Sequence, residues 1–261
     1  MSKPPHLPLP GIRWRGLTLQ LFAWVVLPLI ALLLLVTFGS LALHQRAMRT
    51  LVGERDERAA RTAASALTEQ LNHRTAAIRS LALRAADGHS PSHILLSSNF
   101  LLPDFDAGLA FFSPEGDFLT STGDDVLWIN PTEAFRIELN EMLAVGDADP
   151  RFSSAIPSPA GSKQIVLVSA AAHSGAPIVV GAFYPSTLAE RTLASLFKAG
   201  DQGIICVIAS DGQVLFSIRE GAPLAEPLSH PGVSEALRGE SGAIYTPAED
   251  GEHVVAYSGV A

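Results

Sequence analysis

Cysteine is nearly absent from this chain of 261 residues. Cys206 is the only one, so the chain forms no internal disulfide and no thiolate metal cluster. Cys206 lies in the apolar run of residues 204–208, where we expect a buried and unreactive thiol.

Recognisable metal-binding and catalytic motifs are missing as well. Seven histidines follow the apolar N-terminal segment, and we expect each of them to lie at the surface or in a turn rather than to bind a metal ion. The sequence contains no Gly-x-Ser-x-Gly elbow, no phosphate-binding loop and no His-Glu-x-x-His. We therefore expect no metal ion, no cofactor and no catalytic activity in these residues.

Charged side chains are missing from residues 17–43, which contain no Asp, Glu, Lys, Arg or His. About 20 apolar residues cross a hydrocarbon core of about 30 Å, so this segment is long enough to span a membrane. A cleaved signal peptide is the alternative, but its apolar region covers only about 7–15 residues. We predict a transmembrane helix over residues 17–43, in the inner or plasma membrane.

The distribution of charge predicts the orientation of the chain. Residues 1–16 hold Lys3, Arg13 and Arg15 and no acidic residue, which places them in the cytoplasm by the positive-inside rule. Residues 44–261 are then extracytoplasmic. Removing those three bases from the 18 Lys and Arg leaves 15 against 26 Asp and Glu, a formal charge of −11. Such an acidic region is not expected to bind nucleic acid.

A long helix is predicted directly after the membrane segment. Residues 44–86 contain no Pro and a single Gly, and they are rich in residues that favour helix. One helical face is marked by residues at alternating spacings of four and three: Leu67, Leu71, Arg74, Ile78, Leu81 and Ala85. We expect this helix to dominate residues 44–90 and to pack along the domain and along a second copy in a homodimer.

The rest of the chain contains an internal repeat. Residues 108–121 and 203–217 each combine an apolar strand, a tight turn at Glu115-Gly116 or Asp211-Gly212, and a return strand. A second pair of runs typical of strands follows each hairpin: residues 152–156 with 164–171, and residues 242–246 with 253–258. The turn glycines of the first hairpins, Gly116 and Gly212, are 96 residues apart, and those of the second pairs, Gly161 and Gly251, are 90 residues apart. These similar offsets indicate two copies of one module.

Helices are predicted between the paired strands of each module. They cover residues 132–143 in the first copy and residues 233–237 in the second. The first copy adds a strand at residues 177–183 and a helix at residues 186–197 that leads into the second copy. Each module is therefore expected to be an antiparallel sheet with helices on one side, an α+β arrangement.

This order of elements resembles the double Cache domain of bacterial receptors, in which two PAS-like modules follow a membrane helix and a long outer helix. The resemblance is carried by residues 166–183, with Ser169, the turn His173-Ser174-Gly175 and Val179-Val180-Gly181, and by residues 251–258. It implies a membrane-distal module at residues 91–199, which holds the small-molecule pocket in this family, and a membrane-proximal module at residues 200–261. One more strand and a second membrane helix follow in the family, so we expect the second module to be incomplete here.

The resemblance implies that the chain is the ligand-sensing input region of a transmembrane signalling receptor. The long helix after the span is similar to the start of sensor histidine kinases of two-component systems, whose partner is a response regulator. Chemoreceptors and diguanylate cyclases share the same input and are alternatives. A membrane-anchored outer-surface enzyme and an adaptor protein are alternatives from other functional classes.

Four residues are candidate ligand contacts. Trp128 and Arg136 flank the turn at Asn130-Pro131, and Phe183 and Tyr184 end the strand that the family layout places opposite. An aromatic wall with one arginine suits an anionic or aromatic small molecule. The alternative is that Trp128 and Phe183 belong to the core and Arg136 to a solvated helix face, because large aromatic side chains are usually buried.

Trp128 also bears on the type of ligand. The amino-acid-binding members of the family carry an Arg-x-Trp-Tyr signature, whereas Val126 and Ile129 stand at the Arg and Tyr positions here. The signature therefore does not predict an amino-acid ligand for this chain.

Overall fold

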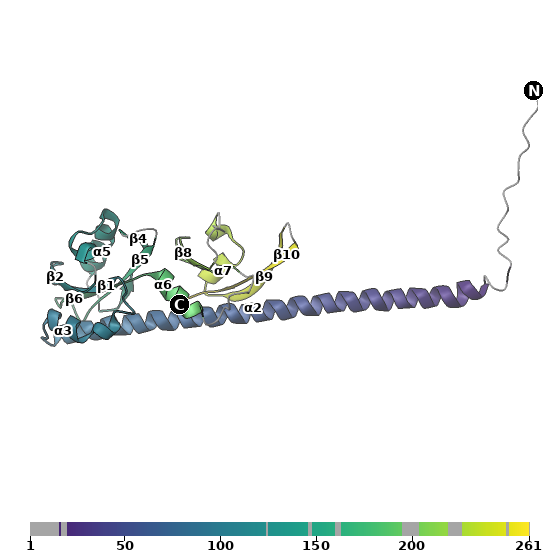
Figure 1. Ribbon diagram of the computed structural model, residues 1–261, viewed down its shortest axis with the longest axis horizontal. Coiled ribbons are helices and arrows are strands. Elements are labelled where there is room, and N and C mark those ends of the chain that lie inside the picture. The colour runs from purple at the N-terminus through teal and green to yellow at the C-terminus, as the bar shows by residue number, and fades with distance from the viewer. Residues whose placement is uncertain are drawn as a thin grey trace, which may run out of the picture. The chain divides into compact units, whose positions relative to one another are not determined.

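One helix dominates the N-terminal part of the protein. The computed structural model describes residue 16 and residues 20–123, 125–145, 148–159, 163–194, 204–218, 226–248 and 251–260. A π-helical turn, η1 (Phe22–Val26), runs directly into α2 (Leu27–Ala86). Figure 1 shows α2 as one long ribbon. The chain divides into two units, residues 1–52 and residues 53–261.

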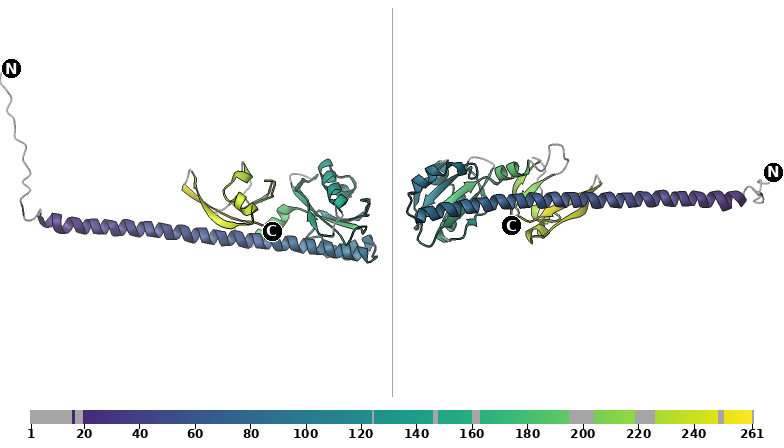
Figure 2. Two further views of the ribbon diagram at one scale, coloured as in Figure 1. Left: turned by 180° about the vertical axis from the view of Figure 1, so that it is seen from behind. Right: turned by 90° about the horizontal axis from the view of Figure 1, so that it is seen from below.

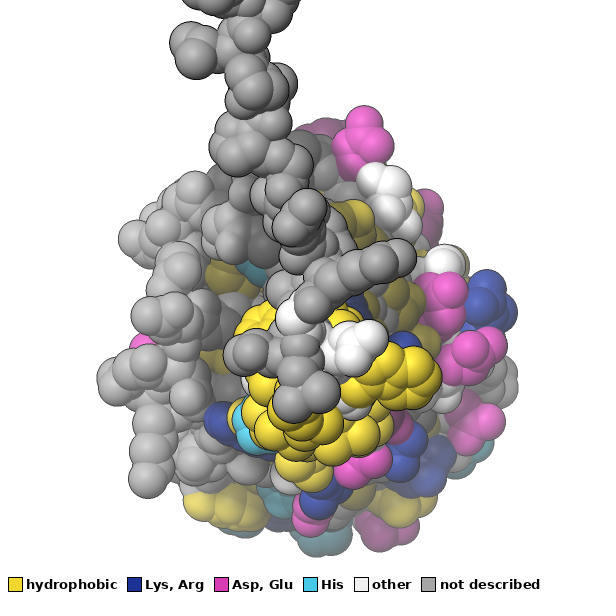
Figure 3. Space-filling view, turned by 90° about the vertical axis from the view of Figure 1, so that its right-hand side faces the viewer, with side chains coloured by type: hydrophobic (Ala, Val, Ile, Leu, Met, Phe, Trp, Pro, Cys, Tyr) yellow, Lys and Arg dark blue, Asp and Glu magenta, His cyan; other side chains and the backbone are white. Residues whose placement is uncertain are grey.

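The first unit contains the apolar part of this helix. None of its most hydrophobic stretch is buried. Hydrophobic side chains gather around the helix end that faces the viewer in Figure 3. Thr37 satisfies its hydroxyl by donating a hydrogen bond to the Leu33 carbonyl at 2.8 Å, as polar side chains in membrane helices do. By length and composition the helix is able to cross a membrane.

In the second unit, α2 continues without a break to Ala86, which confirms the predicted long helix. Five members of the predicted face are buried, namely Leu67, Arg74, Ile78, Leu81 and Ala85, and Leu71 packs against their neighbours. The helix ends before Asp87 and Gly88, and Gly88 takes the positive φ of +86° that a helix end favours. A short helix, α3 (Pro91–Ser97), and a 3₁₀ turn, η2 (Asn99–Leu101), follow.

A six-stranded antiparallel sheet follows α3. Its order is β2-β1-β6-β5-β3, with β4 also paired to β5. The strands are β1 (Gly108–Phe112), β2 (Phe118–Ser121), β3 (Arg151–Phe152), β4 (Ile156–Pro157), β5 (Gln164–Ala171) and β6 (Ile178–Phe183). The predicted hairpin of β1 and β2 is confirmed, and Gly116 supplies the positive φ of +90° in its turn.

Helices cover both faces of this sheet, which corrects the prediction of helices on one side only; Figures 1 and 2 show the sheet from several sides. On one face lie α4 (Asp125–Ile129) and α5 (Glu133–Val145), packed on a core that includes Phe112, Leu167 and Val180. On the other face, α2 and α3 pack on Leu109, Phe111, Val168 and Val179. Because successive strand residues point to opposite faces, both sets of side chains come from the same three strands.

A second group of strands follows α6 (Pro185–Leu193). It contains the hairpin of β7 (Cys206–Ile208) and β8 (Val214–Ser217) and the hairpin of β9 (Ser241–Ala248) and β10 (Gly251–Ser258). Between them lie η3 (Pro227–Ser229) and α7 (Val233–Leu237). Both hairpins and the helix α7 were predicted, and the two hairpin repeats belong to separate sheets. The α+β fold class is thus confirmed, while the predicted module boundary at 199/200 lies outside the described residues.

One apolar cluster joins α2, the large sheet, α6 and the second group of strands. It buries Leu67, Phe183 and Leu188, and Val207 of β7 and Phe216 of β8 pack against it. The prediction of a buried Cys206 is wrong, because its exposure is intermediate. Cys206 starts a strand of a two-stranded sheet, which covers its own side chains less completely than the six-stranded sheet does.

Candidate functional site

Trp128 lies in the core beneath α4 and α5. Only 3% of its surface is exposed, and its ring packs edge-on to Phe135 at 5.7 Å and tilted against Phe112 at 6.3 Å between centroids. Its indole Nε1 is buried and finds no hydrogen-bond acceptor among the described residues. Leaving a buried N–H without a hydrogen-bond partner costs about 1–3 kcal/mol.

The indole N–H lies close to the start of β1. A Cβ added to Gly108 would be 3.0 Å from Trp128 Nε1 and would overlap the Thr122 carbonyl oxygen. Gly108 also has a φ of +110°, which residues with a side chain adopt rarely. Glycine at this position therefore allows the indole nitrogen and the strand backbone to approach each other.

Tyr184 belongs to the same core as Trp128. It is partly buried and packs against the cluster that contains Trp128, and the Lys163 ammonium lies 5.4 Å above the centre of its ring. Its backbone N–H donates a hydrogen bond of 2.9 Å to Asp106 Oδ1. The structure therefore brings Trp128 and Tyr184 to one face of the sheet, with a basic side chain at its edge.

Phe183 lies on the opposite face, which corrects the predicted four-residue wall. It is 2% exposed and belongs to the cluster that includes Leu67 and Leu188. The physical reason is the alternation of side chains along β6, which sends neighbouring residues to opposite faces. Phe183 packs edge-on to Phe152 at 6.3 Å instead.

Arg136 is not gathered with the aromatic residues either. It lies on the exposed side of α5, with 55% of its side chain accessible, and its Nη2 donates a hydrogen bond of 2.6 Å to Glu133 Oε2. This hydrogen bond is the main reason that the pKa of Arg136 is raised. Of the two interpretations given for Arg136, the solvated helix face agrees with its position, and the ligand contact does not.

A second polar group lies under the sheet, around Arg74 of α2. Its Nε donates a hydrogen bond to the Asp104 carbonyl at 2.9 Å, and its Nη1 donates one to the Gln70 carbonyl at 3.0 Å. Its guanidinium lies 5.0 Å from the centre of the Phe183 ring. Burial lowers the pKa of Arg74, while the carboxylates of Asp104 and Asp106 act in the opposite direction.

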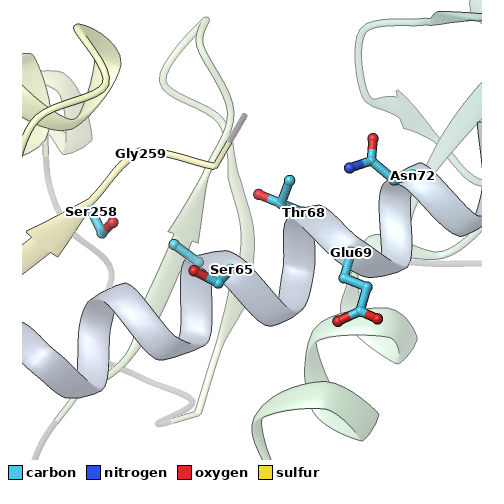
Figure 4. Close-up of a pocket in the computed structure, with 7 residues that line it drawn as sticks. Ser65, Thr68, Glu69, Asn72, Ser258 and Gly259 are labelled. Atoms are coloured by element: carbon cyan, nitrogen blue, oxygen red, sulfur yellow. The ribbon is translucent and has the colours of Figure 1, made fainter.

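Two open cavities border α2. One, of about 320 Å³, is lined by residues of α2 and α6 together with Asp104, and Arg74 and Arg191 are its basic side chains. The other, of about 390 Å³, lies between α2 and the end of β10 and is lined by Thr68, Asn72 and Ser258 among others. In Figure 4, Thr68 and Asn72 project from one side of the helix and Glu69 from the other. Among the lining residues that the structure describes, Glu69 alone is ionisable, so the cavity offers mainly hydroxyl and amide groups.

Metal-ligating side chains do not cluster in the part of the chain that the structure describes. No group of three His, Cys, Asp or Glu residues there lies close enough to hold an ion. The chemistry available at the Trp128 face is therefore hydrogen bonding, aromatic contact and the positive charge of Lys163.

The sequence analysis did not identify two residues of this face as candidates. Asp106 and Lys163 contact Tyr184, but they lie 78 and 21 residues away from it along the chain. Only the pairing of strands brings them together. The separation of Phe183 from Tyr184, in contrast, follows from strand alternation, which the sequence pattern contains.

Comparisons with known proteins support the fold. No protein-family model and no curated protein matches the chain. The extracellular domain of rpHK1S-Z16, described as a histidine kinase, is similar with a TM-score of 0.56 and 16% identity over 80% of this chain and 88% of that one. The ligand-binding domain of the Pseudomonas aeruginosa amino acid chemoreceptor PctB, solved with L-Gln, has a TM-score of 0.50 and 17% identity over 78% of this chain and 82% of that one. The chain thus has the same Cache-like fold as these two domains.

Proposed function

We propose that residues 44–261 are the extracytoplasmic ligand-sensing region of a transmembrane signalling receptor. The Cache-like fold supports this function, since the similar structures are an extracellular domain of a histidine kinase and a ligand-binding domain of a chemoreceptor. The apolar helix at the N-terminus supports attachment to a membrane. The three bases before it support a cytoplasmic N-terminus.

The observation that carries the ligand site is the buried Trp128 Nε1, which finds no acceptor in the part of the chain that the structure describes. A ligand atom that accepts a hydrogen bond would satisfy this buried donor. Tyr184 shares the core of Trp128, and Lys163 stands over the Tyr184 ring. The ligand class that fits is a small molecule with an acceptor group and a negative or aromatic part.

The output is proposed to be that of a sensor histidine kinase in a two-component system. The membrane-distal module, residues 91–199, binds the ligand, and the membrane-proximal module, residues 200–261, passes the signal toward the membrane in a homodimer. A response regulator then receives the signal from an output domain. The long helix that joins the apolar segment to the large sheet supports this order.

A ligand screen tests the proposal. The full chain in detergent micelles is heated with each compound of a library of metabolites, and the unfolding temperature is recorded. A ligand at 100 times its Kd stabilises the folded state by about 2.7 kcal/mol, which raises the unfolding temperature by about 5–10 °C for a domain of this size.

Two variants locate the site once a compound is found. Trp128→Phe removes the indole N–H but keeps an aromatic ring, and calorimetry is expected to show binding about tenfold weaker. Arg136→Gln is the matched control and is expected to bind like the wild type, because Arg136 is exposed and paired with Glu133. A library without any stabilising compound, or equal binding by Trp128→Phe and the wild type, would contradict the proposed site.

A further inference from the structure

A continuous series of contacts links α2 to Tyr184. It starts at Arg74, whose side chain is only 5% exposed although it carries a full charge. Arg74 holds residue Asp104 in two ways, by a hydrogen bond to its carbonyl at 2.9 Å and by an ion pair with its carboxylate at 3.8 Å. Since Nη1 also binds the Gln70 carbonyl one helical turn earlier, the guanidinium is fixed to the helix and to the loop together.

The loop continues the connection to the other face of the sheet. Asp106 lies two residues after Asp104, and its Oδ1 accepts a hydrogen bond of 2.9 Å from the backbone N–H of Tyr184. The same loop is held from α6, because Arg191 Nη1 donates a hydrogen bond of 2.8 Å to the Pro103 carbonyl. The short loop of residues 103–106 is therefore bound to α2, to α6 and to the end of β6.

A second connection runs through the strand itself. The Arg74 guanidinium lies 5.0 Å from the centre of the Phe183 ring, and Phe183 directly precedes Tyr184. A shift of the backbone at the end of β6 therefore changes the contacts of Arg74 by two routes, the loop and the aromatic ring.

The chemistry of Arg74 suits positioning more than stability. Replacing a buried ion pair by apolar residues is often neutral or stabilising, because taking charges out of water is costly. A leucine or methionine at this position of α2 would fill the core without that cost. What an apolar side chain lacks is several directed N–H groups that bind two backbone carbonyls at fixed angles.

We propose that Arg74 is a positioning residue that, through Asp104 and Asp106, couples the backbone of Tyr184 to helix α2. The role of Tyr184 as a ligand contact rests on the proposed function, but the coupling itself does not. A ligand that moves Tyr184 would alter the contacts between the loop and Arg74 of α2, and α2 continues to the apolar segment. Such a ligand shifts the equilibrium only as far as it favours one arrangement over the other.

The chain offers a direct assay, since it contains only three tyrosines, Tyr184, Tyr245 and Tyr257. Labelling the full chain with 3-fluorotyrosine in detergent micelles gives three ¹⁹F resonances, which Tyr→Phe variants assign. The expected result is that Arg74→Lys and Asp106→Ala each move the Tyr184 resonance and leave the Tyr257 resonance in place.

Arg79→Gln is the matched control on the same helix. Arg79 is exposed and pairs with Asp149, so its loss is expected to move none of the three resonances. A Tyr184 resonance that stays in place in Arg74→Lys or in Asp106→Ala would overturn the coupling. Movement of all three resonances together would overturn it as well, because it would show a general role of Arg74 in stability. The assay uses no ligand, so failure of the proposed ligand site would leave its outcome unaffected.

Discussion

The contact between β6 and α2 predicts a large effect for the smallest possible substitution, Gly181→Ala. A Cβ at residue 181 would lie 2.5 Å from two ring carbons of Phe105 and 2.8 Å from Ile78 Cδ1. Both neighbours are fully buried, so neither has free space to move into. Carbon atoms in contact prefer about 3.5–4.0 Å, so β6 must move by about 1 Å away from Phe105 of the loop and Ile78 of α2.

The size of the effect follows from two opposing terms. Overpacking a core costs about 1–3 kcal/mol. Replacing glycine by alanine stabilises the folded state by about 0.4–1 kcal/mol, because it lowers the conformational entropy of the unfolded chain. We expect Gly181→Ala to lower the free energy of unfolding by about 1–2 kcal/mol. For a domain of this size that lowers the unfolding temperature by about 2–8 °C.

Urea unfolding of the full chain in micelles, followed by circular dichroism, measures this loss. Gly39→Ala is the matched control, because a Cβ there meets nothing within 4 Å, and it is expected to be neutral or slightly stabilising. The double variant Gly181→Ala with Phe105→Leu is expected to lose less stability than the sum of the two single variants. If Gly181→Ala unfolds at the same urea concentration as the wild type, the described packing of β6 on Phe105 and Ile78 is wrong.

Three further predictions concern other parts of the chain. Phe183→Ala is expected to cost about 3–5 kcal/mol in urea unfolding, because the ring is fully packed; a loss below 1 kcal/mol would contradict its buried position. Gly53→Leu is expected to push β9 away from α2, since any side chain at residue 53 overlaps the Tyr245 hydroxyl, and faster hydrogen exchange of β9 measures this; unchanged exchange would argue against the contact. Alkaline phosphatase fused after residue 200 is expected to be active, because the bases before the span place the N-terminus in the cytoplasm; a stable but inactive fusion would reverse the orientation.

Local sequence signals predicted the elements that depend on local physics. The glycines at 116 and 212 marked two hairpin turns, and both adopt the positive φ that such turns require. The alternating spacing from Leu67 to Ala85 identified the buried face of α2. The absence of charge in residues 17–43 identified the apolar helix.

The parts that local signals missed depend on long-range pairing. The contact of Asp106 with Tyr184 spans 78 residues, so only the finished sheet creates it. Arg136 was a candidate because it lies near Trp128 in sequence, but the turn of α5 directs it to solvent and to Glu133. Arg74 was assigned to the helical face, yet its role depends on a loop 30 residues later.

Fluorescence of Trp128 tests the central claim, that a small molecule binds at this face of the large sheet. The chain has three tryptophans, so Trp14→Phe and Trp24→Phe leave Trp128 as the only indole. Titration with a compound from the screen is expected to change the Trp128 emission with the same Kd that calorimetry gives, because the ligand supplies the acceptor that the indole N–H does not find among the described residues. Saturable binding by calorimetry with no change in Trp128 emission would contradict the claim.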